Sequence, residues 1–501
     1  MEEKGKALTI MAVAVALVAV LSLVAWEDVS GGWFKSFSLI SDITGNKDAA
    51  TTQTDYLDPD LALLEEGVDT TRFEYIDEPV IDTVSIVETF NGDDETLLTA
   101  EAEPFNVPTV STTHEDAALT ETVKEKRDVT PTPDVLPRVY GSTPFIDFSG
   151  GANIARLRKS LSDASKRTVR FAVVGDSYIE GDIFTQGVRE ALQTNYGGNG
   201  IGYTPLFSEI PGFRRSVMHS CENFEALDFR KKSERKYCLL PGIAMRAGEG
   251  AAATFNGTSK VPHADRWQRA TLMFETPRGG SFKVRTEKKG EWTTYSFESS
   301  DSLHILNFNQ PSSYFSISSI TPGIIFQGLY LDGDKGIALD NMSIRGYAGI
   351  RHDEIDEHLT ALSRNSVDYD VIVLEFGINA LSASQTNYSN YANKMTEVVN
   401  HLKKIYPKAT FIIMGIGDRG EKRGGEIHSM RTVGNMIDAQ KEIAKATKSL
   451  FYDTRIAMGG EDAVVDWVKN GEINKDYIHL SFKGGKTLAE IFYNDLEEAI
   501  K

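Results

Sequence analysis

Apolar and polar positions follow two different patterns along this chain, and the change from one to the other predicts how it is divided. In residues 141–205 and 340–501, short apolar runs alternate with longer segments in which apolar residues recur at helical spacing. The apolar runs predict buried strands at 170–174, 342–346, 371–376, 410–415 and 450–453. The helical segments are 152–165, 183–196, 390–406, 433–448 and 485–500. Strands that alternate with helices are typical of a parallel sheet with helices on both faces, so these stretches predict one discontinuous α/β domain.

The stretch between them, residues 206–339, has a different pattern. Alternating runs such as FKVRTE, YFSISSI and GIIFQGLYLD are separated by turns rich in Gly, Pro, Asn and Asp. Such runs indicate short antiparallel strands, and the stretch therefore predicts a β-sandwich inserted into the α/β domain. Some of its aromatic residues are candidates for stacking on sugars, with core packing as the more common role; they are Trp267, Trp292, Tyr295 and Tyr330.

The N-terminus carries a continuous apolar segment. Residues 7–26 contain no charged residue, and Lys4 and Lys6 precede them. About 20 such residues can span a bilayer, and the preceding lysines favour a cytoplasmic N-terminus. We interpret residues 1–26 as a single membrane anchor, with a cleaved signal peptide as the alternative. Either interpretation exports the α/β domain to the periplasm or the exterior, and the first holds it at the inner membrane.

The charge of the chain is concentrated next to this segment. The 501 residues carry a formal net charge of −19, and residues 27–140, with 26 acidic and 7 basic residues, hold all of it. This segment is also rich in Thr and Pro, a composition that buries too little apolar surface to offset the entropy of ordering. We therefore predict an acidic disordered linker over residues 27–140. No region has the basic excess that nucleic-acid binding requires.

Two short motifs of the α/β stretches carry side chains for nucleophilic catalysis. Ser177 follows the predicted strand 170–174 across a Gly-Asp turn, and Asp476 precedes His479 by three residues in KDYIHLSFKG. A serine hydroxyl becomes a nucleophile when a base takes its proton, and a carboxylate fixes the tautomer of a histidine base. We therefore expect Ser177, His479 and Asp476 to act as nucleophile, base and orienting acid in a serine esterase or acyltransferase.

Three hydrogen-bond donors are candidates for stabilising the oxyanion of a tetrahedral intermediate. They are the backbone amides of Ser177 and Gly346 and the side-chain amide of Asn379 in LEFGINAL. All three follow predicted strands, and in parallel sheets the reactive groups gather at the carboxyl ends of strands. We therefore expect them to lie at one edge of the sheet.

These motifs together resemble the four sequence blocks of the SGNH (GDSL-type) hydrolases. The blocks are, in order, GDS at 175–177, Gly346, GIN at 377–379 and DYIH at 476–479. The flanking sequences resemble the branch that contains bacterial peptidoglycan O-acetylesterases and polysaccharide O-acetyltransferases. Members of that branch carry a comparable β-rich insert that resembles a carbohydrate-binding module.

The resemblance covers residues 141–205 and 340–501, and it implies a flavodoxin-like α/β fold with the same assignment of catalytic and oxyanion-hole residues. The sequence departs from the pattern at Tyr178, where many members of the branch have His. Because Tyr178 has none of the core roles, the departure bears on substrate preference and not on the chemistry.

The resemblance implies an enzyme that acts on O-acetyl groups of glycans. We favour an exported serine esterase that removes acetyl groups from a cell-envelope or extracellular glycan through an acyl-serine intermediate. The first alternative is an O-acetyltransferase that receives its acetyl group from a membrane-bound acyltransferase partner. The second is a non-catalytic glycan-binding protein of the envelope, against which the intact Ser177, Asp476 and His479 argue.

Other candidate sites follow from the remaining reactive residues. No histidine has a spacing to Cys, Asp or Glu that indicates a metal site, and we expect no metal and no other cofactor. The only two cysteines, Cys221 and Cys238, are expected to form a disulfide in an exported protein. Four arginines are candidates for lining a catalytic cleft, with structural roles as the alternative: Arg345, Arg351, Arg419 and Arg431.

Overall fold

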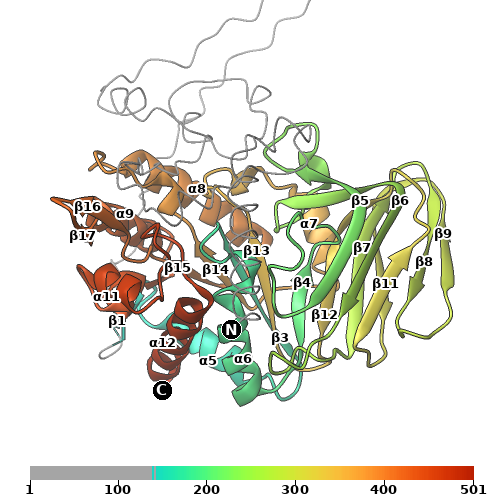
Figure 1. The fold of residues 1–501 in the computed structure, drawn as a ribbon, viewed down its shortest axis with the longest axis horizontal. Helices are drawn as coiled ribbons and strands as arrows, with labels where there is room; N and C mark the ends of the chain where they lie inside the picture. Colours follow the sequence, from blue (N-terminus) through green and yellow to red (C-terminus); the bar gives the residue numbers. More distant parts are fainter. Residues whose placement is uncertain (1–137, 140–142) are drawn as a thin grey trace, which may run out of the picture. The chain divides into compact units, whose positions relative to one another are not determined.

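The computed structural model describes residues 138–139 and 143–501, and their α/β domain is built on a seven-stranded sheet (Figure 1). The strands lie in the order β1-β2-β18-β15-β14-β3-β13. Their bounds are Arg138–Val139 (β1), Phe145–Asp147 (β2), Thr168–Gly175 (β3), Gly336–Ser343 (β13), Val371–Glu375 (β14), Thr410–Met414 (β15) and Leu450–Tyr452 (β18). The last five run parallel, whereas β2 and β1 pair antiparallel at one edge. The predicted parallel sheet is confirmed.

Helices cover both faces of this sheet, as predicted. Side chains of α5, α6 and α12 share one hydrophobic cluster with Val173 of β3, and those of α8 and α9 share another with Val174 (Figure 1). Successive side chains of a strand point to opposite faces, so these two valines identify the two faces. The helices are α5 (Ala152–Ser162), α6 (Thr185–Tyr196), α7 (Glu357–Ser363), α8 (Ser389–Ile405), α9 (Val433–Ala446), α10 (Thr454–Met458), α11 (Ala463–Lys469) and α12 (Phe482–Ile500).

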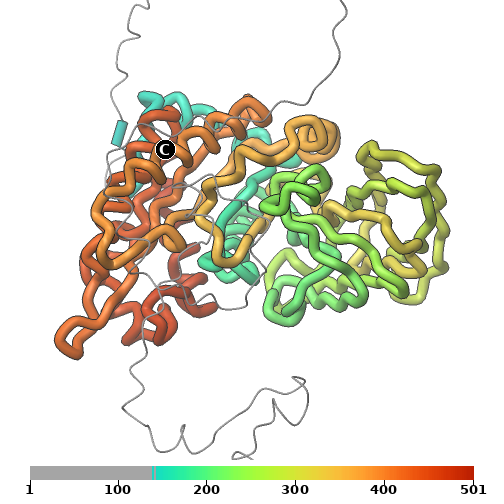
Figure 2. The backbone as a smooth tube through the Cα atoms, turned by 90° about the horizontal axis from the view of Figure 1, so that it is seen from above, coloured from blue at the N-terminus to red at the C-terminus, as the bar shows by residue number. Residues whose placement is uncertain are grey.

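The insert is an antiparallel nine-stranded sheet that folds into two layers. Its strands are β4 (Gly200–Thr204), β5 (Met218–Asp228), β6 (Ile243–Asn256), β7 (Arg269–Thr276), β8 (Gly280–Arg285), β9 (Thr293–Phe297), β10 (Ser300–Phe308), β11 (Tyr314–Ser318) and β12 (Ile325–Asp332). The long strand β6 pairs with β12 near one end and with β11 near the other, and so joins the layers. Phe274 of β7 and Phe282 of β8 meet between them, with ring centroids 5.0 Å apart. The predicted sandwich is present, and Figure 2 shows it beside the α/β domain.

The structure moves both boundaries of the insert toward the N-terminus. β4 already pairs with β12 of the insert, although residues up to 205 were assigned to the α/β domain. Conversely, β13 begins at Gly336 and pairs with β3, so the strand predicted at 342–346 lies earlier. The cause is the polar pair Asp340-Asn341, which is buried in β13 and interrupts its apolar run. The linker prediction is also wrong at its end, because Arg138–Val139 forms β1.

Asp340 is buried because a cluster of hydrogen-bonded charges surrounds it. The guanidinium of Arg170 on β3 donates to both carboxylate oxygens of Asp340, at 2.9 and 3.0 Å, and it also pairs with Asp332 on β12. Asp340 accepts further hydrogen bonds from the backbone of Tyr203 and from the hydroxyl of Tyr369, both at 2.8 Å. This Arg170 cluster therefore ties the insert strands β4 and β12 to the central sheet.

The four aromatic residues proposed for the insert have different positions. Trp267 and Tyr330 are core residues, 1% and 2% exposed, so the core alternative is correct for them. Tyr295 is half-buried against Phe282. Trp292 is 37% exposed, and the guanidinium of Arg285 lies 4.6 Å from its ring centroid.

The disulfide predicted between Cys221 and Cys238 is wrong, because both thiols are free. The Sγ of Cys221, on β5, lies 3.4 Å from the backbone nitrogen of Ser208. The Sγ of Cys238 is fully buried, 3.7 Å from the carbonyl oxygen of Leu227. The two residues pack against different hydrophobic clusters, so their closeness in sequence does not bring the thiols together.

The predicted membrane anchor, residues 1–26, and the linker up to residue 137 lie outside the described residues. Within residues 143–501, no helix is both long and apolar enough to cross a bilayer.

Candidate active site

Ser177 lies just beyond the carboxyl end of β3, which runs between β14 and the edge strand β13. The last residue of that strand, Gly175, is paired with Ser343 of β13 on one side and Glu375 of β14 on the other. A Cβ at Gly175 would lie 2.7 Å from the carbonyl oxygen of Glu375, so this close approach requires glycine. After it, Asp176 accepts a hydrogen bond from the backbone nitrogen of Tyr178 at 2.9 Å and closes the turn that presents Ser177.

The structure brings the three predicted catalytic side chains together. The Oγ of Ser177 lies 2.9 Å from Nε2 of His479, and Nδ1 of His479 lies 2.8 Å from Oδ2 of Asp476. Asp476 and His479 belong to the short loop before α12, which is closed by a bridge between Ile473 and Leu480. The serine therefore comes from the start of the domain and its base from the end, 302 residues later.

Asp476 is fixed as an ionised acceptor. Its Oδ1 accepts the backbone N–H groups of Ile478 and His479, at 2.9 and 3.0 Å, while Oδ2 faces the imidazole. Partial burial acts to raise the pKa of Asp476, but the hydrogen bonds from His479 and Ile478 outweigh it and the pKa lies below its ordinary value. An ionised Asp476 holds the proton of His479 on Nδ1 and leaves Nε2 free to accept the proton of Ser177.

Two of the predicted oxyanion-hole donors follow the strands beside β3. Gly346 comes shortly after β13 with a φ of 68°, and no atom lies within 4 Å of the position its Cβ would take. Asn379 follows β14 in a short 3-10 helix, η7 (Ile378–Ala380). Its Nδ2 donates to Oδ2 of Asp176 at 2.7 Å and to the carbonyl oxygen of Tyr347 at 3.3 Å. The oxyanion role of these groups stays a prediction.

A pair of buried carboxyl groups lies behind the nucleophile and was not predicted. Asp176 is fully buried, and burial raises its pKa to about 7 despite the hydrogen bonds it accepts. Glu375 is 1% exposed, and burial together with the charge of Asp176 raises its pKa well above the ordinary value. Glu375 therefore keeps its proton while Asp176 accepts from Asn379. The only sign of this carboxyl pair in the sequence is that Glu375 ends an apolar run.

Tyr178, the departure from the family pattern, is buried beside Ser177. Its ring is 4% exposed, and its hydroxyl lies 3.9 Å from Sδ of Met458. Two of the candidate arginines, Arg351 and Arg419, are likewise buried and hydrogen-bonded to backbone carbonyl groups. The structural alternative is correct for both arginines.

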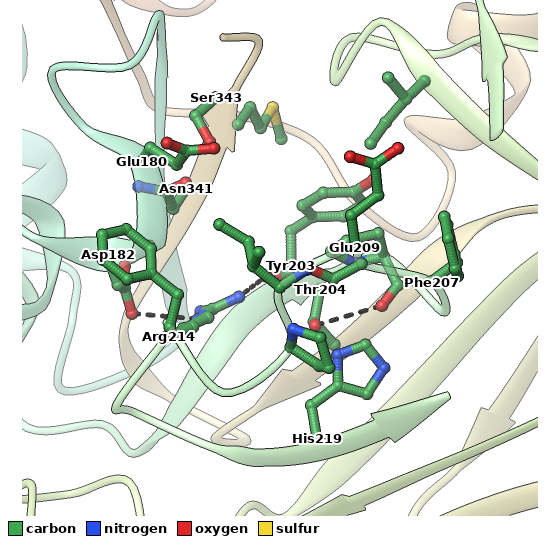
Figure 3. Close-up of a pocket in the computed structure, with 18 of the residues that line it drawn as sticks. Glu180, Asp182, Tyr203, Thr204, Phe207, Glu209, Arg214, His219, Asn341 and Ser343 are labelled. Carbon is green, nitrogen blue, oxygen red and sulfur yellow. Dashed lines mark hydrogen bonds and ion pairs between the residues drawn. The ribbon is translucent and has the colours of Figure 1, made fainter. Parts of the chain in front are cut away.

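A cavity of about 300 Å³ is lined by residues that closely follow Ser177 in the chain or lie next to Gly346 (Figure 3). Glu180, three residues after Ser177, and Arg345, next to Gly346, belong to its lining, whereas Ser177 and His479 do not. The opposite wall is the segment 203–219, which leaves β4 and enters β5 of the insert. Among residues 143–501, no group of three or more His, Cys, Asp or Glu side chains is arranged to hold a metal ion.

The segment 203–219 is fixed to the α/β domain by Arg214. Its guanidinium pairs with the fully buried Asp182 at 3.2 Å and donates to the carbonyl oxygen of Tyr203 at 2.9 Å (Figure 3). It also donates to the carbonyl oxygen of Ile201 at 2.9 Å. Asp182 ends the 3-10 helix η4 (Glu180–Asp182) and also binds Arg189 of α6 at 2.7 Å. Burial acts to raise the pKa of Asp182, but the two arginines outweigh it and hold the pKa far below its usual range. The insert wall of the cavity is therefore anchored by an ionised Asp182.

The fold resembles that of a solved esterase. No family model and no curated protein matches the sequence. A peptidoglycan O-acetylesterase superposes with a TM-score of 0.59 at 21% identity, over 71% of this chain and 99% of that chain. This likeness shows that the two chains share a fold.

Two other solved structures show weaker similarity. An acetylxylan esterase from Geobacillus stearothermophilus has a TM-score of 0.23 at 22% identity, over 32% of this chain and 73% of its own. A family two carbohydrate esterase from Cellvibrio japonicus has a TM-score of 0.25 at 10% identity, over 57% of this chain and 98% of its own.

Proposed function

We propose that this chain is a serine esterase that removes O-acetyl groups from a glycan through an acyl-serine intermediate. The observation that carries the proposal is the unbroken set of contacts from Ser177 through His479 to an ionised Asp476. That arrangement supplies a nucleophile, a base in the correct tautomer and a group that stabilises the imidazolium.

In the first half of the reaction, the Oγ of Ser177 attacks the carbonyl carbon of the ester while Nε2 of His479 takes the hydroxyl proton. The negative charge develops on the former carbonyl oxygen, where donors such as the amides of Ser177 and Gly346 would stabilise it. The intermediate then expels the sugar oxygen, which takes the proton from His479, and the acetyl group stays on Ser177. In the second half, His479 takes a proton from a water molecule that attacks the acyl-serine, and it returns this proton to the Oγ of Ser177 as that oxygen leaves. Acetic acid is released and ionises in solution.

The choice of an acetylated glycan is supported by the shared fold and by the cavity. The protein with the same fold is described as a peptidoglycan O-acetylesterase. The cavity of about 300 Å³ is at the small end of ordinary ligand sites and suits one sugar unit. An acyl-serine also reacts with a sugar hydroxyl in place of water, so transfer is the alternative outcome on the same residues.

We further propose that the enzyme is exported and held at the inner membrane by residues 1–26. The support is the uncharged apolar run 7–26, which is long enough to span a bilayer. A membrane-bound acyltransferase partner belongs to the transfer alternative alone. Extraction of membranes with alkaline carbonate should leave the protein in the pellet, and protease added outside the inner membrane should digest it.

The catalytic proposal is tested with the purified full-length chain, Ser177→Ala and the control Ser302→Ala, an exposed serine on β10. Each is given an O-acetylated glycan, with and without an unacetylated oligosaccharide, and free acetate and acetylated oligosaccharide are both quantified. Acetate release that needs Ser177 and is unaffected by the acceptor supports the esterase. Acetyl groups found on the acceptor would establish transfer, and equal activity of wild type and Ser177→Ala would reject catalysis by this site.

A further inference from the structure

The cavity shown in Figure 3 has two walls of different origin. One is formed by Glu180 of η4 and by Arg345, after β13. The other is formed by the segment 203–219 of the insert, which contributes Glu209 (Figure 3). A ligand in this cavity would therefore touch both the α/β domain and the insert.

Three charged side chains of the cavity differ from the others in having no close partner. Asp182 and Arg214 are engaged in the ion cluster described above. In contrast, Glu180, Glu209 and Arg345 make no side-chain hydrogen bond or ion pair within the part of the chain that the structure describes. Figure 3 shows the carboxylates of Glu180 and Glu209 at opposite sides of the cavity. Glu180 is half-buried, and a half-buried carboxylate without a partner is costly and gains when a ligand donates hydrogen bonds to it. Glu209 and Arg345 are exposed to solvent and carry no such cost.

Glu180 lies within electrostatic range of the catalytic base. Burial raises the pKa of Glu180, while the positive charges of Arg345 and of a protonated His479 act to lower it and Glu209 acts to raise it. Glu180 is therefore within electrostatic range of both His479 and Glu209.

The remaining lining suits the apolar face of a sugar ring. Phe207, Ile210 and Phe213 come from the insert segment, and Ile210 and Phe213 are 46% and 37% exposed. Aromatic and aliphatic surface next to carboxylate acceptors matches a pyranose, which has apolar C–H faces and hydroxyl groups at its rim. The unpartnered charges include both signs, so the cavity is not selective for a strongly anionic polymer.

We propose that this cavity holds the sugar ring that carries the ester, and that Glu180 and Glu209 accept hydrogen bonds from its free hydroxyl groups. The inference rests on the proposed function and specifies its substrate, a sugar with a free hydroxyl next to the acylated position. The ester oxygen must lie within reach of His479, which returns the proton to it. A hydroxyl on the neighbouring carbon then faces Glu180, and the far side of the ring meets Glu209.

The test compares esters that differ only in those hydroxyl groups. The substrates are the mono-O-acetates of methyl glucopyranoside, each beside its analogue in which the other hydroxyl groups are methylated, and p-nitrophenyl acetate. The enzymes are the full-length wild type, Glu180→Gln, Glu209→Gln and the control Glu222→Gln. Glu222 is an exposed glutamate of β5 outside the cavity.

We expect the wild type to prefer at least one free sugar ester over its methylated analogue by about tenfold in kcat/KM, the effect of a hydrogen bond to a charged group. Glu180→Gln and Glu209→Gln should each reduce that preference, whereas Glu222→Gln should retain it. The two substitutions should reduce kcat/KM for the methylated analogues much less than for the free esters. The effect of the substitution then depends on the hydroxyl groups of the substrate, as expected for two groups that interact directly.

Two results would overturn the inference. Either the wild type hydrolyses every free ester and its methylated analogue equally well, or the preference survives in both Glu180→Gln and Glu209→Gln. Failure of the proposed function is distinguishable, because p-nitrophenyl acetate would then be hydrolysed equally by wild type and Ser177→Ala.

Discussion

Replacement of Asp476 by Asn tests whether this residue orients His479, because the asparagine amide must turn its NH₂ group toward the imidazole. In the wild type, Oδ1 of Asp476 accepts two backbone N–H groups, and Oδ2 accepts the Nδ1 proton of His479. An asparagine keeps one oxygen, and the two backbone donors hold that oxygen in the position of Oδ1. Its NH₂ group must then face Nδ1 of His479. The imidazole proton is then held on Nε2. Because Nε2 carries a proton, it cannot accept the proton of the Ser177 hydroxyl.

The expected loss is large because the wrong tautomer disables the base without displacing it. We expect kcat to fall by about four orders of magnitude, the effect of this replacement in Ser-His-Asp triads, which corresponds to about 5.5 kcal/mol in the activation free energy. The fold should be retained, since the backbone hydrogen bonds of the Asp476 loop are preserved. Asp476→Ala loses those hydrogen bonds as well and should lower both activity and stability.

The assay is steady-state hydrolysis of p-nitrophenyl acetate by the full-length protein, with urea unfolding as the measure of stability. Asp466→Asn is the matched control, because Asp466 lies in α11 and takes no part in the catalytic contacts. A fall in kcat of less than about thirtyfold in Asp476→Asn, with unfolding unchanged, would refute the assignment of Asp476 as the orienting carboxylate.

Three further predictions concern buried groups. The pKa of Glu375 is higher in the folded protein than in the unfolded chain, so above the ordinary pKa of glutamate the unfolded chain loses this proton while the folded protein keeps it. The free energy of unfolding of the wild type should therefore fall as pH rises, by up to about 1.4 kcal/mol per pH unit. In urea unfolding between pH 5 and pH 8, Glu375→Gln should lack this contribution to the pH dependence. The same change of unfolding free energy with pH in wild type and Glu375→Gln would contradict the prediction. Asp182→Asn should cost about 3–5 kcal/mol, because it leaves buried arginines without their counterion, whereas Asp265→Asn, in an exposed pair, should cost less than about 1 kcal/mol. Reductant should leave the Tm unchanged, and Cys221 should react with a thiol reagent faster than the fully buried Cys238; a bridged species on a non-reducing gel would disprove the free thiols.

The meeting of Ser177, His479 and Asp476 could be predicted from the sequence because its signals are local. Ser177 follows an apolar run and a Gly-Asp turn, and Asp476 and His479 lie in one loop. Parallel strands end at a common edge of the sheet, so reactive residues that follow several such strands are expected to lie close together. Recognising the strands and the motifs after them needs only short stretches of sequence, and the inserted residues do not change those stretches.

The misplaced elements depend on contacts between distant residues. The strand β13 contains Asp340, whose burial makes sense only beside Arg170, 170 residues earlier in the chain. The burial of Glu375 likewise depends on its place beside Asp176. The disulfide was predicted from the presence of two cysteines in an exported chain, but strand β5 carries Cys221 away from Cys238. Which distant residues lie next to one another cannot be seen from the order of apolar and polar residue types along the chain.

The proposed part of the insert in substrate selection depends on two buried ion clusters that fix the insert to the α/β domain. Arg170 binds Asp332 at one point, and Asp182 binds Arg214 at the other, next to the cavity. Arg214→Met should leave Asp182 paired with Arg189 but free the segment that carries Glu209. The kcat/KM for a free sugar acetate should then fall by a larger factor than that for p-nitrophenyl acetate, which lacks a sugar ring. Equal losses for the two esters would show that the insert wall supports the fold of the active site and does not select the substrate.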